Sequence, residues 1–83
     1  MKRTIADFTE TEFLEFVIKI YEIDYPSDRA HLNAIFDFVR IAEHPKRSDL
    51  LCYPDPGKEG PRAIVDEVKA WRAANGKPGF KSE

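Results

Sequence analysis

Apolar side chains recur every three to four residues along most of the chain, which is the spacing of one face of an α-helix. The first run begins after Thr9, a favourable N-cap residue whose capping box is completed by Glu12 three positions later. Phe8 precedes this cap and is placed to pack against Phe13. These signals predict the start of a helix at residue 10.

This first helix is expected to cover residues 10–23, because Pro26 cannot continue it. Its predicted inward-facing side chains are Phe13, Phe16, Val17 and Ile20, with Ile23 as a further candidate. A second helix is predicted to begin after Ser27, which can cap it, and to continue as far as Glu43 and His44.

A short third helix is predicted over residues 49–52. Ser48 can cap it, and Pro54 and Pro56 leave room for only one turn. Tyr53 follows this turn, and its position fits either the core or a partner interface.

The fourth helix has clear signals at both ends. Proline at position 61 suits a first helical turn, and Asn75 followed by Gly76 suits a helix end. One apolar stripe is predicted to face the core and consists of Ile64, Val65, Val68 and Trp71. The opposite face is predicted to be solvated and consists of Asp66, Glu67, Lys69 and Arg72. No segment alternates with period two, so the fold class is all-α.

The second helix carries more apolar side chains than one buried face requires. At about 100° per residue they fall on two stripes. One stripe consists of Ala30, Ala34, Phe38 and Ile41, and the other of Leu32, Ile35, Phe36 and Val39. Both could be buried between helices, or the second could be an exposed partner-binding patch. The pattern alone leaves both interpretations open.

The composition and charge indicate a soluble protein with a single domain. A chain of 83 residues forms one domain, and 42% hydrophobic with 34% charged residues fits a soluble globular protein. Thirteen basic against fifteen acidic residues give a net charge of −2, which argues against a DNA-binding protein and mildly favours a basic partner. No apolar run is long enough to span a membrane and no secretory core is visible, so we expect a cytoplasmic protein without membrane association.

The sequence lacks recognisable catalytic machinery. It has no Gly-rich phosphate loop, no activated-serine motif and no paired metal-binding histidines, since His31 and His44 are 13 positions apart. We expect His44 to be a packed or hydrogen-bonded structural residue. The single cysteine, Cys52, cannot form an internal disulfide and lacks zinc-site spacing. We therefore expect no enzymatic activity, metal or cofactor.

Three separated groups of motifs are similar to one known family. They are DFTE at 7–10 with EFL at 12–14; then EHP at 43–45, SDL at 48–50 and YP at 53–54; and finally IV at 64–65, VK at 68–69, WRAANG at 71–76 and GFK at 79–81. In order and spacing the chain resembles the immunity proteins of E-type colicins and S-type pyocins. The resemblance implies a distorted antiparallel four-helix bundle with a short third helix, in one domain over residues 1–83.

The resemblance also implies a function. Such a protein binds the nuclease domain of its cognate toxin one-to-one beside the active site, without occupying the metal centre, and protects the producing cell. The family favours a DNase. An anchor shared within the family maps to Ser48, Asp49, Cys52, Tyr53 and Pro54, and partner discrimination maps to Asp28, His31, Leu32, Ile35, Phe36 and Val39. Acidic residues such as Asp28, Asp37 and Asp49 are expected to steer the encounter with a basic domain.

This chain departs from the family pattern at two positions. Cys52 stands where the family commonly has a tyrosine, and Val39 stands where relatives often carry an acidic residue. The second departure implies a less basic cognate surface. A helical adaptor without a toxin partner is the alternative function, and weak self-association through the apolar stripe stays open.

Overall fold

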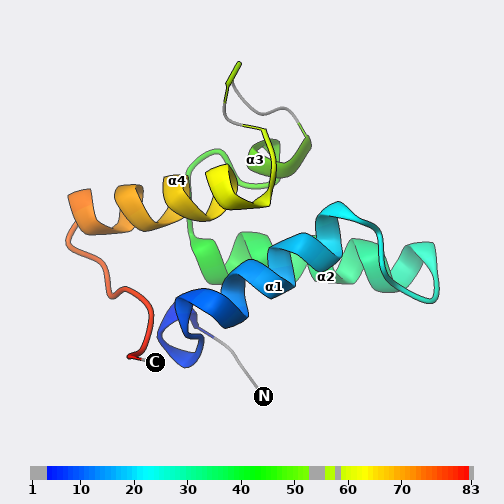
Figure 1. Ribbon diagram of the computed structural model, residues 1–83, viewed down its shortest axis with the longest axis horizontal. Coiled ribbons are helices and arrows are strands. Elements are labelled where there is room, and N and C mark those ends of the chain that lie inside the picture. The colour runs from blue at the N-terminus through cyan, green and yellow to red at the C-terminus, as the bar shows by residue number, and fades with distance from the viewer. Residues whose placement is uncertain (1–3, 53–55, 58, 83) are drawn as a thin grey trace.

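The structure is a computed structural model that describes residues 4–52, 56–57 and 59–82. Its elements are a 3-10 helix η1 (Ile5–Asp7) and the α-helices α1 (Glu10–Tyr21), α2 (Asp28–Ala42), α3 (Asp49–Cys52) and α4 (Pro61–Ala74). The described residues contain no strand, which agrees with the predicted all-α class. Helices α1 and α2 run in opposite directions, and α4 packs across α1 (Figure 1).

The start of α1 confirms the capping prediction. The Thr9 side chain accepts a hydrogen bond from the backbone N–H of Glu12 at 3.0 Å, and the Glu12 carboxylate accepts one from the N–H of Thr9 at 2.9 Å. Phe8 and Phe13 meet edge to face with ring centroids 5.5 Å apart. Both phenyl rings are buried, so this contact fixes the chain where it enters the helix.

The end of α1 differs from the prediction. The helix stops at Tyr21, two residues early, and Ile23 has a left-handed φ of +56°. The Ile23 side chain is 60% exposed, so it does not belong to the core. Ile23 fits the apolar spacing of α1, but the helix ends before it, at the C-cap residue Glu22, and the Ile23 side chain lies at the surface.

Helix α2 is capped as expected by Ser27, whose hydroxyl accepts from the Ala30 N–H at 3.1 Å. It ends at Ala42, slightly before the predicted limit, because Glu43 has a left-handed φ of +57°. The first apolar stripe faces the core: Ala34, Phe38 and Ile41 are buried, and Ala30 is half-buried.

Two predictions for α4 are wrong. Its bounds match the sequence signals, and Ile64, Val65 and Val68 are buried as expected. Trp71, however, is only half-buried, whereas Arg72, which was expected to face water, is 3% exposed. Hydrophobicity alone predicts a buried Trp71 indole and an exposed Arg72 guanidinium. The guanidinium is buried instead because it finds hydrogen-bond acceptors inside the protein.

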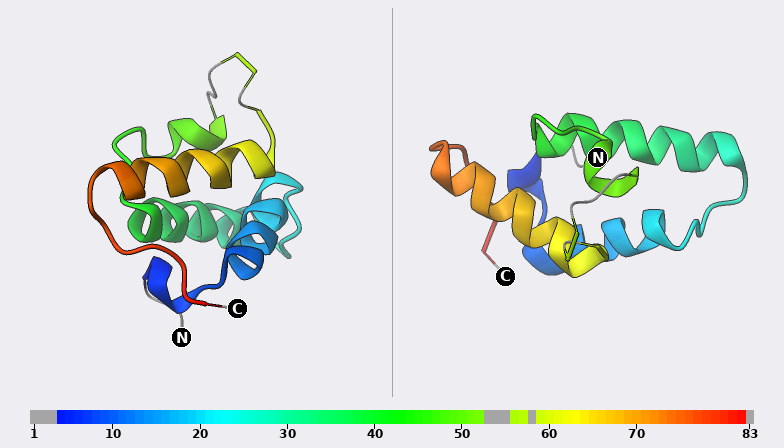
Figure 2. Two further views of the ribbon diagram at one scale, coloured as in Figure 1. Left: turned by 60° about the vertical axis from the view of Figure 1, so that its left-hand side comes forward. Right: turned by 90° about the horizontal axis from the view of Figure 1, so that it is seen from above.

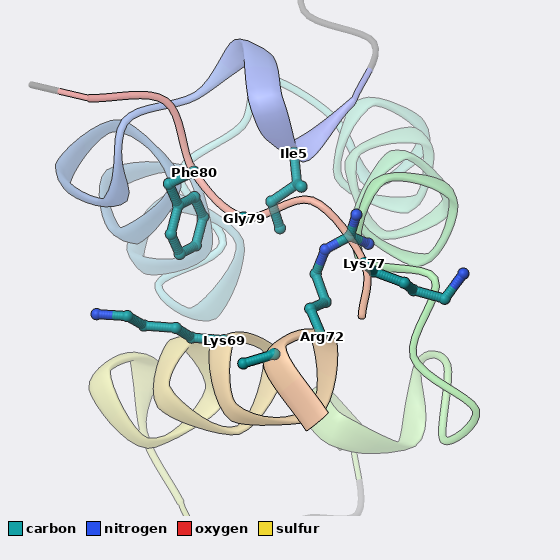
Figure 3. A pocket seen from close by; sticks show the side chains of 7 residues that line it. Ile5, Lys69, Arg72, Lys77, Gly79 and Phe80 are labelled. Atoms are coloured by element: carbon teal, nitrogen blue, oxygen red, sulfur yellow. The ribbon is translucent and has the colours of Figure 1, made fainter. Parts of the chain in front are cut away.

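Those acceptors come from the end of α2 and from the C-terminal tail. Arg72 Nε donates to the carbonyl of Pro78 at 2.7 Å, and Nη1 donates to the carbonyl of Ala42 at 3.0 Å and to the Glu43 carboxylate at 3.4 Å. In Figure 3 the Arg72 side chain extends from α4 toward the tail, beside a pocket of about 200 Å³. Arg72 therefore ties three segments together.

The C-terminal tail returns to the beginning of the chain (Figure 2). The Lys81 N–H donates to the carbonyl of Phe8 at 2.9 Å, and the Phe80 ring lies 5.4 Å from the ring of Phe13. The core that these elements enclose consists of Ile5, Phe8, Phe13, Val17, Ile20, Ala34, Phe38, Ile41, Ala42, Leu50, Ile64, Val65 and Val68. No helix in the described ranges is long and apolar enough to cross a membrane.

Candidate functional site

The second apolar stripe of α2 lies on the outside of the molecule. We call His31, Leu32, Ile35, Phe36 and Val39 the α2 outer face. Leu32 is 48% exposed and Phe36 is 60% exposed, while the other three side chains are half-buried. Ile35 and Val39 pack against the core with one edge and leave the other in water. Of the two interpretations left open by the pattern, the structure therefore favours a partly exposed apolar surface.

His31 is held rigidly within this face. Its Nε2 donates to the carbonyl of Ile20 at 2.9 Å, which connects α2 to the end of α1. The Tyr25 ring lies against the imidazole with centroids 5.7 Å apart, and Lys19 Nζ lies 4.9 Å from the centre of the Tyr25 ring. Burial raises the pKa of the Tyr25 hydroxyl above its ordinary value, and the nearby carboxylates of Asp24 and Asp37 add to this effect.

The turn between α2 and α3 is organised by His44, which is 5% exposed. Its Nδ1 accepts a hydrogen bond from the Lys46 N–H at 3.1 Å, which places the ring proton on Nε2, and Nε2 lies 3.1 Å from the Glu67 carboxylate. The indole of Trp71 packs against the imidazole at 5.2 Å. His44 is therefore a packed, hydrogen-bonded structural residue, as expected, and it fixes where α3 begins.

The predicted anchor is described only in part. Ser48 is half-buried and Asp49 is exposed at the start of α3, one turn that is fixed to the core by Leu50. Cys52 is the last residue of α3, but its side chain lies outside the described part of the molecule. Tyr53 and Pro54 also lie outside the described residues.

The charged residues around the α2 outer face include both signs. Asp28, predicted to take part in partner choice, is exposed in the first turn of α2. Asp37 is paired with Arg40 at 3.4 Å, with both side chains more than half exposed. Among residues 4–52, 56–57 and 59–82, no three His, Cys, Asp or Glu side chains are grouped so that they could hold a metal ion.

Sequence reasoning missed two exposed apolar residues next to this surface. Tyr21 is 46% exposed and Ile23 is 60% exposed, and both lie where α1 ends. A signal was present, because Ile23 continues the helical spacing although the chain must turn before Pro26. Periodicity alone could not show that the turn had already begun.

Comparisons with known proteins agree with this geometry. The family model described as colicin immunity protein / pyocin immunity protein matches residues 5–74. This chain belongs to the colicin/pyocin immunity protein family. It is 46% identical to the pyocin-S1 immunity protein of Pseudomonas aeruginosa over 86 aligned positions, which cover 99% of both chains. The pyocin-S2 immunity protein of strain PAO1 matches with the same identity and coverage.

Two solved structures have the same fold as this family member. A chain in the crystal structure of the pyocin AP41 DNase-immunity complex superimposes with a TM-score of 0.89 at 37% identity, covering 99% of this chain and 100% of that one. A chain in the structure of the mutant nuclease domain of pyocin S8 with its cognate immunity protein gives a TM-score of 0.89 at 33% identity, covering 98% and 100%. The distorted four-helix bundle and the family resemblance are thereby confirmed, and the family consists of inhibitors rather than enzymes.

Proposed function

We propose that this protein binds the nuclease domain of one bacteriocin in a 1:1 complex and prevents that domain from cutting DNA in the producing cell. The observation that carries the proposal is the α2 outer face, which stays exposed beside α3 in a fold that two nuclease–immunity complexes share. Exposed leucine and phenylalanine side chains on one helix face are the kind of surface that marks a protein interface.

The inhibitor acts by covering the nuclease surface next to its active site. A bound domain that measures 35 × 33 × 19 Å is large enough to exclude a DNA duplex by steric bulk alone. Within the contact surface we assign the shared anchor to Ser48, Asp49, Cys52, Tyr53 and Pro54. We assign partner discrimination to Asp28 and the α2 outer face.

The experiment is an endonuclease assay with the toxin domain encoded beside the gene for this chain. Plasmid cleavage by that domain is measured with increasing amounts of this protein. We expect complete inhibition at an equimolar ratio, and no cleavage by this protein alone. Residual cleavage with the toxin domain saturated would contradict the proposal.

The assignment of residues has its own tests. Tyr53→Ala is expected to weaken binding by at least about 2 kcal/mol with little loss of fold, as truncation of a buried interface aromatic often does. Replacing the five residues of the α2 outer face with those of the pyocin-S2 immunity protein should change the preferred toxin and leave the melting temperature nearly unchanged. An unchanged preference in calorimetric titrations with both toxins would move discrimination away from α2.

A further inference from the structure

A pocket of about 240 Å³ lies where α1, α2 and α3 meet. It is lined by Ile20, Tyr21, Ile23, His31, Ile35 and Leu51, and we call it the three-helix pocket. Two of these residues, His31 and Ile35, also belong to the α2 outer face. The pocket is therefore continuous with the proposed nuclease-binding surface and extends it onto the end of α1.

The backbone on one side of this pocket is unusual for its sequence. The Asp24 N–H donates to the carbonyl of Lys19 at 3.0 Å, and the Ile23 N–H donates to the carbonyl of Ile20 at 3.1 Å. This pair of bonds is a Schellman motif, whose left-handed residue is usually glycine or asparagine. Here it is Ile23 with φ +56°, and a β-branched residue is strongly disfavoured in that conformation.

Folding of the isolated chain gains little from this choice of residue. The Ile23 side chain is 60% exposed, so the strained backbone is not offset by full burial of the side chain. Strained residues of this kind concentrate at functional sites, where the side chain is needed for contact with a partner. Tyr21 on the same rim of the pocket is also largely exposed, at 46%.

The wall on the α2 side is already in place without a partner. His31 is fixed by its hydrogen bond to Ile20 and by the Tyr25 ring, so its imidazole does not have to be ordered on binding. A pocket that is pre-formed loses less conformational entropy when it is filled. None of the described residues that line it carries a formal charge, so among these residues a charged partner group would find no counter-ion.

We infer that the three-helix pocket receives one apolar side chain of the nuclease domain, and that Ile23 and Tyr21 form the rim that closes around it. This inference rests on the proposed function. A cavity of about 150 Å³ is enough for a benzene ring, so a leucine, methionine or phenylalanine side chain on a protruding segment of the partner fits this pocket. The interface thus extends from α2 to the end of α1.

The test uses a substitution whose effects on stability and binding have opposite signs. Ile23→Gly removes the rim side chain and places glycine where the Schellman motif favours it. We expect a melting temperature equal to or above that of the wild type, together with at least a roughly tenfold higher Kd for the toxin domain encoded beside the gene. Ile23→Asn should behave in the same way, because asparagine also tolerates the left-handed conformation.

The matched control is Glu43→Gly, which relieves the left-handed backbone at the end of α2 and leaves the three-helix pocket intact. Its Kd should stay within about threefold of the wild type. If the wild type binds the toxin and both Ile23 variants bind equally well, the inference is overturned and the proposed function stands. A lower melting temperature in both variants would make Ile23 a folding residue and would also overturn the inference. Failure of the wild type to bind would overturn the proposed function itself.

Discussion

Arg72 and Arg62 lie on the same helix and offer a direct comparison of buried with exposed hydrogen bonds. Arg72 is 3% exposed and donates to two backbone carbonyls and one carboxylate. Arg62, with its side chain 51% exposed, donates to the carboxylates of Asp66 and Glu10 at 2.7 and 2.8 Å. Replacing each with methionine keeps most of the side-chain volume and removes only the donors.

The two substitutions should differ several-fold in their effect on the free energy of unfolding. A hydrogen bond from a charged donor contributes about 1.5–3 kcal/mol. Arg72 makes one to the buried carbonyl of Ala42 and one, only part-buried and thus at the lower end of that range, to the carbonyl of Pro78, so Arg72→Met is expected to cost about 3–5 kcal/mol. Its longer contact with the half-exposed Glu43 adds little. Arg62→Met removes only exposed ion pairs and should cost less than about 1 kcal/mol.

Thermal and urea unfolding followed by circular dichroism measures both variants. A domain of this size has a total stability of roughly 4–12 kcal/mol, so Arg72→Met should remove about a quarter of it or more. Its melting temperature should fall by at least about 12 °C, since each kcal/mol corresponds to about 4–8 °C. Equal losses in the two variants would refute the argument, because burial would then make no difference to the strength of these bonds.

Two further changes test the packing of α4 and its contact with α1. Trp71→Ala should lower the free energy of unfolding by only about 2 kcal/mol, because the indole is half-buried against His44. This loss is smaller than the one expected for a fully buried indole, and thermal melting measures it. Hydrogen bonds from Lys69 and Arg62 lower the pKa of the Glu10 carboxyl group in the folded protein. The ion pairs of Glu10 therefore stabilise the fold at pH values above its unfolded-state pKa, near 4.5. This stabilisation is lost as the pH falls through the lower folded-state pKa. Glu10→Gln should therefore flatten the dependence of stability on pH below about 4.5 in urea titrations.

Helix boundaries were predictable from the sequence wherever a cap residue is chemically distinctive. Thr9 with Glu12 and Ser27 marked the N-termini of α1 and α2 correctly, because their side chains hydrogen-bond to adjacent backbone. Pro61 marked the N-terminus of α4, because its fixed φ suits a first helical turn that needs no N–H donor. The end of α1 was misjudged, since Ile23 is chemically a poor candidate for the left-handed position that it occupies.

Burial was predictable for most apolar residues, but the prediction failed for Ile23 and Trp71 and, among the described cations, for Arg72. The burial of Arg72 depends on carbonyls of Ala42 and Pro78, which lie 30 and 6 positions away in the sequence, and no local pattern reveals that they converge. The candidate site was also only partly predictable, because its exposure depends on contacts between segments that are distant in the sequence. The surplus stripe on α2 was visible as a pattern, but which half of it stays exposed depends on how α1 and α3 pack beside it.

The charges around the proposed interface determine how association should respond to salt. Residues 28–52 carry four acidic and four basic side chains, so this segment has no net charge. The acidic ones are Asp28, Asp37, Glu43 and Asp49, and the basic ones are Arg29, Arg40, Lys46 and Arg47. Asp37 is moreover paired with Arg40. Steering of a basic partner by Asp28, Asp37 and Asp49 is therefore largely cancelled by neighbouring cations.

We accordingly expect a shallow salt dependence, with an association rate that falls less than about tenfold between low and high ionic strength in stopped-flow measurements with the cognate toxin domain. Val39→Glu supplies the comparison, because it adds an acidic group to the α2 outer face where relatives often carry one. That variant should show a steeper salt dependence and a faster dissociation rate, because the proposed interface would bury the added carboxylate without a counter-ion. If the wild-type rate instead falls by a hundredfold or more, the encounter is guided by the remaining eleven acidic and nine basic residues of the chain, and the charge balance of residues 28–52 does not control it.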